Sequence, residues 1–298
     1  MEYHNPVLLE ESVNGLNIKP DGVYVDVTFG GGGHSKLILS KLGEKGKLYA
    51  FDQDIDALEN KIDDPRFTLI NENFRFIKRF LRFHGVKEVD GILGDFGVSS
   101  HQFNVAERGF STRFEAKLDM RMNQKSSLSA FEVINEYEEE HLKKLFYEYA
   151  DLRNAPKLAS EIVKARTEAP IESSEQLKEI LRPFLFKEKE HKILAQIYQA
   201  IRIEVNQEIE ALKEFLLQTQ DLIKKGGRLS LISYHSLEDR LVKRFIRSGL
   251  FEGEPEKDFF GNISFPFKKV GGLIVPTADE IYKNNRARSA KLRIAKKL

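Results

Sequence analysis

Cysteine is absent from this chain of 298 residues, and its absence excludes several classes of chemistry. Without thiols there can be no disulfide, thiolate zinc site or cysteine-held iron–sulfur cluster, and no cysteine nucleophile. The seven histidines are too scattered along the chain to form an H-x-H or H-x-x-x-H pair. We therefore expect no structural metal site.

Long apolar runs and an excess of one charge are also lacking. No run approaches the ~18–20 residues that a membrane-spanning helix needs, and residues 1–6 lack the basic and apolar regions of a signal peptide. The net charge is only +1, so any affinity for nucleic acid must come from local patches. These features predict a cytoplasmic protein with no membrane partner.

Short β-rich runs alternate with helical patterns from residue 22 to 97 and again after residue 206, with strands expected at 23–28, 47–51, 67–70, 89–93 and 228–233. Such alternation is typical of βαβ units in a parallel sheet. Between residues 104 and 205 helical patterns prevail. We predict a doubly wound, mostly parallel α/β domain, residues 1–103 and 206–298, interrupted by a helical insertion, residues 104–205. A helix is expected at 206–224, ending at Gly226.

Residues 30–33 are four consecutive glycines between the first predicted strand and a helix. Glycines there let a ligand approach the backbone, and the helix N-terminus offers free N–H groups. The register differs from the dinucleotide fingerprint G-x-G-x-x-G, because the sixth position from Gly30 is Ser35. Asp52 ends the next strand, where a carboxylate can accept both hydroxyls of a ribose. A tight turn would explain the four glycines alone, and a cap for the helix that begins near residue 54 would explain Asp52 alone. The two features together favour a nucleoside-type cofactor.

Two more residues follow strands of the same predicted sheet. Phe74 comes after the third strand, where its ring could stack on an adenine or simply pack in the core. Asp95 ends the fourth strand and opens the segment DFGVSS. Ligands of open α/β sheets bind at the carboxyl ends of the strands, so Asp95 is well placed for chemistry. A turn-forming aspartate before Gly97 is the alternative interpretation.

Sequence motifs along nearly the whole chain resemble the RsmH family, also called MraW. They lie, in order, at residues 4–11 (HNPVLLEE), 28–35, 95–100, 107–111 (ERGFS), 118–122 (LDMRM), 199–206 (QAIRIEVN), 226–229, 233–240 and 286–289. The resemblance implies an S-adenosylmethionine-dependent methyltransferase that modifies the N4 amine of one cytidine in the decoding region of 16S ribosomal RNA. It also implies a class I, Rossmann-like α/β fold with an inserted helical domain that recognises the substrate.

The family's cofactor contacts carry over to matching positions of this chain. The resemblance places the methionine end of S-adenosylmethionine at the glycine loop, its ribose at an acid and its adenine at an aromatic ring; the matching residues are Gly32, Gly33, His34, Asp52, Phe74, Asp95 and Gln102. Three positions depart from the family pattern. Gly94 replaces an apolar residue, Asn285 replaces a proline, and residues 149–153 read YADLR where FGEER is usual.

Methylation of the N4 amine sets its own chemical requirements. The lone pair of this nitrogen is delocalised into the ring, so the enzyme must align it with the methyl donor at ~3–3.5 Å and accept its hydrogens. We take Asp95 as the candidate catalytic acceptor, helped by the backbone carbonyls that follow it. The lack of cysteine agrees, because methylation at carbon 5 of cytosine usually needs a thiolate whereas amine methylation does not.

Candidate substrate-binding residues lie in family-like segments outside the cofactor crevice: Asp119, Arg121, His235 and Arg286. Ser236 and Asp239, in contrast, fit a helix capping box. The chain after Glu280 is basic and contains no acid, which suits either phosphate binding or a solvated tail. The expected partner is 16S ribosomal RNA within the small ribosomal subunit. The sequence does not decide the oligomeric state, for which a homodimer is one option.

Two other functions remain open at this level. One is an NAD-dependent Rossmann oxidoreductase, which the glycine register disfavours. The other is a non-catalytic RNA-binding factor of ribosome assembly, which would bind RNA without transferring a methyl group. An assay with labelled S-adenosylmethionine separates all three.

Overall fold

The computed structural model describes residues 6–255, 257, 259–260 and 263–298 of the chain, so His4 and Asn5 of the first motif lie outside the described residues. The chain divides into two compact units. The sheet unit contains the chain up to Gly97 together with Ile209–Leu298, and the helical unit contains Val98–Glu208. Among the described residues, no helix is both long and apolar enough to cross a membrane.

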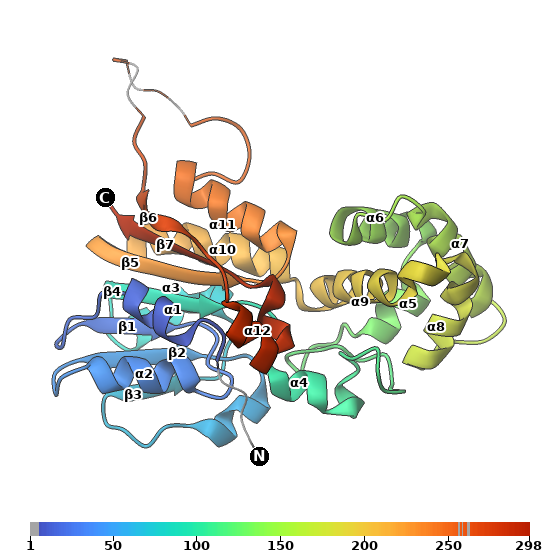
Figure 1. Ribbon diagram of the computed structural model, residues 1–298, viewed down its shortest axis with the longest axis horizontal. Helices are drawn as coiled ribbons and strands as arrows, with labels where there is room; N and C mark the ends of the chain where they lie inside the picture. The colour runs from blue at the N-terminus through green and yellow to red at the C-terminus, as the bar shows by residue number, and fades with distance from the viewer. Residues whose placement is uncertain (1–5, 256, 258, 261–262) are drawn as a thin grey trace. The chain divides into compact units, whose positions relative to one another are not determined.

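The sheet unit is built on a seven-stranded sheet with the order β3-β2-β1-β4-β5-β7-β6 (Figure 1). Strands β1 to β5 run parallel, and β7 and β6 pair antiparallel at one edge. The strands are β1 (Val23–Asp26), β2 (Lys47–Phe51), β3 (Phe67–Ile70), β4 (Val89–Asp95), β5 (Ile223–Ser233), β6 (Phe267–Ile274) and β7 (Lys291–Lys297). The predicted doubly wound, Rossmann-like class I fold is confirmed.

Helices cover both faces of this sheet. They are α1 (Leu9–Gly15), α2 (Gly33–Lys41), α3 (Ile77–Phe83), α10 (Glu208–Leu222), α11 (Ser236–Ser248) and α12 (Ala278–Lys283), with 3₁₀ turns η1 (Ile55–Asn60), η2 (Phe74–Phe76) and η6 (Asn285–Ser289). Side chains alternate across each strand, so Tyr24 packs with α1 and α2 whereas Val25 packs with α3, α10 and α11. Both faces are therefore buried, which explains the nearly unbroken apolar strands.

The helical unit has a core of its own. Its elements are α4 (Ser100–Asn104), α5 (Ala130–Glu136), α6 (Glu139–Ala150), α7 (Ala155–Arg166), α8 (Ser174–Leu181) and α9 (Glu190–Asn206), with 3₁₀ turns η3 (Ala106–Arg108), η4 (Arg182–Phe184) and η5 (Lys187–Lys189). On α6, Leu142, Leu145 and Phe146 form the buried stripe that faces this core. Ser129 and Ser173 begin α5 and α8 with capping boxes.

The helix expected at 206–224 is present, but the end predicted for it at Gly226 is wrong. The expected helix is α10 (Glu208–Leu222), and α9 ends just before it at Asn206, with Gln207 in a left-handed conformation (φ 49°) between them. Gly226 does not end a helix but lies inside β5, which begins at Ile223. The strand β6 was not predicted, because its residues are mostly exposed and include Lys268 and Lys269.

Candidate active site

The glycine loop connects β1 to α2 and is fixed by a buried acid. The Asp26 carboxylate, fully buried at the end of β1, accepts hydrogen bonds from the Thr28 backbone N–H at 3.1 Å and the Ser35 hydroxyl at 2.7 Å. Gly30 and Gly32 adopt left-handed conformations, with φ of 50° and 77°, which glycine tolerates without strain. A Cβ atom added at Gly30 would meet no other atom within 4 Å, so there is open space beside the backbone at this position of the loop.

Asp52 follows β2 directly and ties this loop to the neighbouring strand. Its Oδ2 accepts the Gly30 N–H at 2.8 Å, and its Oδ1 accepts the Asp54 N–H at 2.9 Å. Burial raises the pKa of Asp52 to about 6, against the effect of these two donors. The helix cap considered above is provided by another residue, since the side chain of Asp54 accepts the Asp56 N–H where η1 begins. Because a carboxylate oxygen can accept two hydrogen bonds, Asp52 keeps acceptor capacity for a ribose.

Phe74 follows the loop after β3 and is the first residue of η2. Its half-buried ring contacts Phe96 and Phe215, with centroids 5.6 and 5.4 Å away. The preceding Asn73 caps η2 through the Arg75 N–H and donates to the Gln53 side chain at 2.8 Å. The ring is therefore anchored by core contacts beside the segment that follows Asp52.

Asp95 ends β4, and β4 pairs directly with β1. Its backbone N–H donates to Thr28 Oγ1 at 2.6 Å, and its Oδ1 accepts the Tyr234 hydroxyl at 2.7 Å. Burial raises the pKa of Asp95 to about 6, while His34, when it is protonated, and the hydrogen bond from Tyr234 act in the opposite direction. The sequence reasoning missed Tyr234, although it follows β5 at the same edge of the sheet.

His34, in the first turn of α2, is a buried and uncharged member of the site. Its Nε2 lies 3.2 Å from the Val7 carbonyl oxygen. Burial lowers the pKa of His34 below its usual value of 6.5, although the charge of Asp95 opposes this effect, so the ring is neutral at pH 7. A Cβ atom at Gly33 would lie 2.1 Å from Pro6 Cγ, which places the residues before α1 directly against the loop.

Three of the predicted site residues belong to the helical unit, where each has a local structural role. Gln102 and Ser99 form a reciprocal capping box at the start of α4. The Gln102 backbone N–H donates to Ser99 Oγ at 3.2 Å, and the Ser99 backbone N–H donates to Gln102 Oε1 at 3.0 Å. Asp119 and Arg121 form a bidentate ion pair at 2.6 and 3.0 Å, and Arg121 also donates to the Ser126 carbonyl oxygen.

The substrate candidates at the end of the chain lie in the sheet unit. His235 is the residue that caps α11, with its Nε2 3.1 Å from Glu238 Oε1. The capping box predicted for Ser236 and Asp239 is therefore wrong by one position. Asp239 instead pairs with Arg293 and Lys291, because α11 packs against β7, the strand that carries both. Arg286 lies in η6, where its N–H donates to Asn284.

The glycine loop after β1 and the acids at the ends of β2 and β4 lie on neighbouring strands at the carboxyl edge of the sheet, where open α/β folds of this class bind a nucleoside-type cofactor. The residues fit S-adenosylmethionine, because there is open space beside the backbone at Gly30 and the Asp52 carboxylate can accept hydrogen bonds from a diol.

Comparison with known proteins identifies the family. The MraW methylase family matches residues 1–298, and the chain belongs to it. The chain is 79% identical to the ribosomal RNA small subunit methyltransferase H of Christiangramia forsetii over 298 residues, covering 100% of this chain and 99% of that protein. The proteins of the same name from Flavobacterium johnsoniae and Bacteroides fragilis (strain ATCC 25285) are 68% and 57% identical, over 100% and 99% of this chain and 99% and 97% of theirs. Membership of this family does not favour the oxidoreductase or the non-catalytic binding protein.

Proposed function

We propose that the chain methylates the N4 amine of one cytidine in the decoding region of 16S ribosomal RNA, acting in the cytoplasm on the small ribosomal subunit. The observation that carries this proposal is the position of Asp52, the glycine loop and Asp95 on neighbouring strands, since β1 pairs with both β2 and β4. The name shared by the relatives supports the RNA substrate. The resemblance of the sequence motifs supports the N4 position.

The cofactor site in this proposal is the carboxyl edge of β1, β2, β3 and β4. The glycine loop would receive the methionine end, Asp52 the ribose hydroxyls and Phe74 one face of the adenine; with Asp95 and Gln102 the proposed set is Gly32, Gly33, His34, Asp52, Phe74, Asp95 and Gln102. Support for the ribose contact comes from Asp52, which is half-buried and already oriented by two N–H donors. Neutral His34 adds no positive charge that would repel the sulfonium.

Asp95 is the proposed catalytic residue. When bound, S-adenosylmethionine supplies an electrophilic methyl group on a sulfonium. The carboxylate of Asp95 accepts hydrogen bonds from the amine, which orients the nitrogen lone pair, and it can take up the proton that the nitrogen gives up. With a pKa of about 6, Asp95 is ionised at pH 7.5 yet is a better proton acceptor than an ordinary aspartate.

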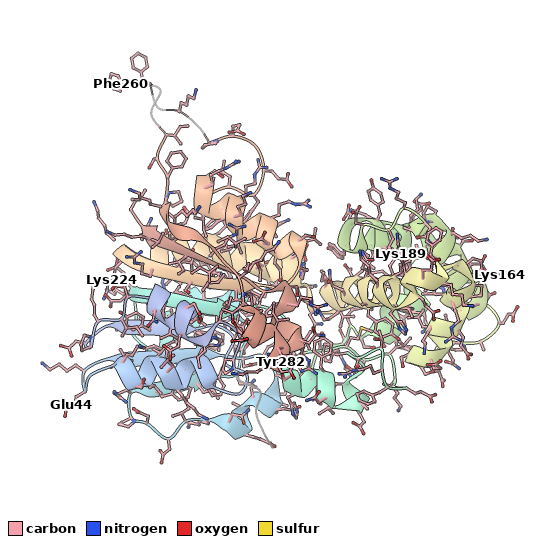
Figure 2. The ribbon with its side chains drawn as sticks, viewed as in Figure 1. Glu44, Lys164, Lys189, Lys224, Phe260 and Tyr282 are labelled. Atoms are coloured by element: carbon pink, nitrogen blue, oxygen red, sulfur yellow. The ribbon has the colours of Figure 1, made fainter. Side chains whose placement is uncertain are left out.

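The proposed RNA contacts are His235 and Arg286 in the sheet unit and Asp119 and Arg121 in the helical unit, which we propose is the substrate-recognition domain. Tyr282 on α12, labelled in Figure 2, supports an RNA surface near Arg286 because its ring is 92% exposed and exposed aromatic rings stack on unpaired bases. Lys291 and Arg293 are less suited to phosphate binding, because both pair with Asp239.

The test is transfer of a labelled methyl group from S-adenosylmethionine to RNA in small ribosomal subunits from cells that lack this methyltransferase. Wild-type protein should label 16S RNA, and Asp95→Asn should not. RNA binding without label would favour the non-catalytic assembly factor. Calorimetric binding of NAD rather than S-adenosylhomocysteine would favour the oxidoreductase.

A further inference from the structure

The carboxylate of Asp95, the proposed catalytic residue, is held by the hydroxyl of a tyrosine that lies outside the glycine loop. Tyr234 follows β5 directly, and its hydroxyl donates to Asp95 Oδ1 at 2.7 Å. Its backbone N–H in turn donates to Glu238 Oε2 at 3.0 Å. The tyrosine is thus fixed at both ends, at its backbone by α11 and at its hydroxyl by Asp95.

The backbone around Asp95 is shaped to admit this ring. Gly97 has a φ of 123°, and a Cβ atom added there would lie 3.2 Å from Tyr234 Cδ2. A larger residue at this position would be strained and would press on the ring. On the other side, the Asp95 N–H is held by Thr28 at 2.6 Å. The backbone and the side chain of Asp95 are therefore restrained separately, by Thr28 and by Tyr234.

The two oxygens of Asp95 differ as a result. Oδ1 is occupied by the tyrosine hydroxyl, whereas no other residue in the described ranges donates a hydrogen bond to Oδ2. The titratable groups that face Asp95 are Asp26 on β1, His34 on α2 and Glu238 on α11. Since His34 is neutral at pH 7 and the other two are acids, Tyr234 is the side chain that donates a hydrogen bond to the ionised form of Asp95.

We propose that Tyr234 is a positioning residue for methyl transfer, holding Oδ1 of Asp95 so that Oδ2 faces the amine of the substrate. The inference rests on the proposed function and deepens it. It predicts that loss of the hydroxyl changes the protonation and orientation of Asp95 while leaving the cofactor site intact.

Tyr234→Phe removes the hydroxyl and keeps the ring. Losing a donor that favours the ionised carboxylate should raise the pKa of Asp95 by about 1 unit, which corresponds to about 1.4 kcal/mol. The acid limb of kcat against pH should move upward by the same amount. At pH 6 the ratio of kcat to its plateau value should then be roughly fivefold lower than in wild type. Well above the Asp95 pKa, where the carboxylate is ionised in both proteins, KM for RNA and the affinity for S-adenosylhomocysteine should stay unchanged.

The measurement combines this pH profile with carboxyl carbon NMR of the free protein, assigned through Asp95→Asn, which reports the Asp95 titration without turnover. Tyr49→Phe is the matched control, because Tyr49 is a buried tyrosine of β2 with no bond to Asp95. Should Tyr234→Phe not fold, fluorotyrosine at position 234, a stronger donor, should move the Asp95 titration and the acid limb downward.

An unchanged Asp95 titration in folded Tyr234→Phe, with the same acid limb as wild type, would overturn the inference. So would an equal shift in Tyr49→Phe. Wild-type protein that transfers no methyl group would instead overturn the proposed function, and the NMR titration would still decide whether Tyr234 controls Asp95.

Discussion

Replacement of Asp52 by alanine isolates the ribose contact. A hydrogen bond to a charged group contributes ~1.5–3 kcal/mol, and ~1.4 kcal/mol corresponds to a tenfold change in affinity. We therefore expect Asp52→Ala to weaken S-adenosylhomocysteine binding by about ten- to a hundredfold at pH 7.5. The variant also loses the 2.8 Å bond to Gly30, so the loop becomes less ordered and the loss should lie toward the upper end of this range.

Calorimetry at several pH values gives a second signature of the same contact. The pKa of Asp52 in the free protein is about 6, and only the ionised carboxylate accepts from both hydroxyls. Wild-type affinity should fall as the pH drops below about 6, and Asp52→Ala should lack that component. Asp54→Ala removes the neighbouring cap of η1 and serves as the control. Equal affinity of wild type and a folded Asp52→Ala would refute the ribose role.

Three further predictions concern the acids and the helical unit. Asp95→Asn should lower the rate of methyl transfer by at least ~100-fold in single-turnover assays, with S-adenosylhomocysteine still bound; a near-normal rate would contradict its role. For Asp26, burial raises the folded-state pKa to about 6 from 3.8, so the native state takes up its proton first and the unfolding free energy should rise as pH falls from about 6 toward 4. Asp52 and Asp95, whose pKa values are also about 6, add slopes of the same sign, so urea denaturation should show a slope that is smaller by about 1.4 kcal/mol per pH unit in Asp26→Asn than in wild type. Replacing residues 104–205 by a Gly/Ser linker, which keeps Gln102, should preserve S-adenosylhomocysteine binding measured by calorimetry but abolish RNA methylation; a folded variant that still methylates RNA would show that the inserted helical segment does not recognise the substrate.

The parallel part of the sheet was predictable from sequence because its strands are buried on both faces. Such strands are short apolar runs, and the polar residues that end them, Asp52 and Asp95, mark the carboxyl edge where ligands bind. The edge strand β6 carried no such signal, since it is lysine-rich and mostly exposed. The boundary predicted between residues 205 and 206 lies within two residues of the break between α9 and α10, where Gln207 turns the chain without a glycine or proline.

The candidate site was only partly predictable for a different reason. Asp52 and the glycines are close in sequence, so their meeting follows from one βαβ unit. Tyr234 and Asp95 are 139 residues apart, and their contact requires β5 to pair with β4, which no local pattern encodes. Asp119 and Arg121 are the opposite case. The sequence predicts that both bind RNA, and in the structure they form an ion pair with each other.

The measurement that tests the central claim most directly is the position of the transferred methyl group. Small ribosomal subunits from cells that lack the enzyme are incubated with the protein and S-adenosylmethionine, and nuclease fragments of the 16S RNA are sequenced by mass spectrometry. The account predicts one new methyl group, on N4 of a single cytidine in the decoding region. A methyl group on carbon 5, on a ribose or on another nucleotide would contradict it.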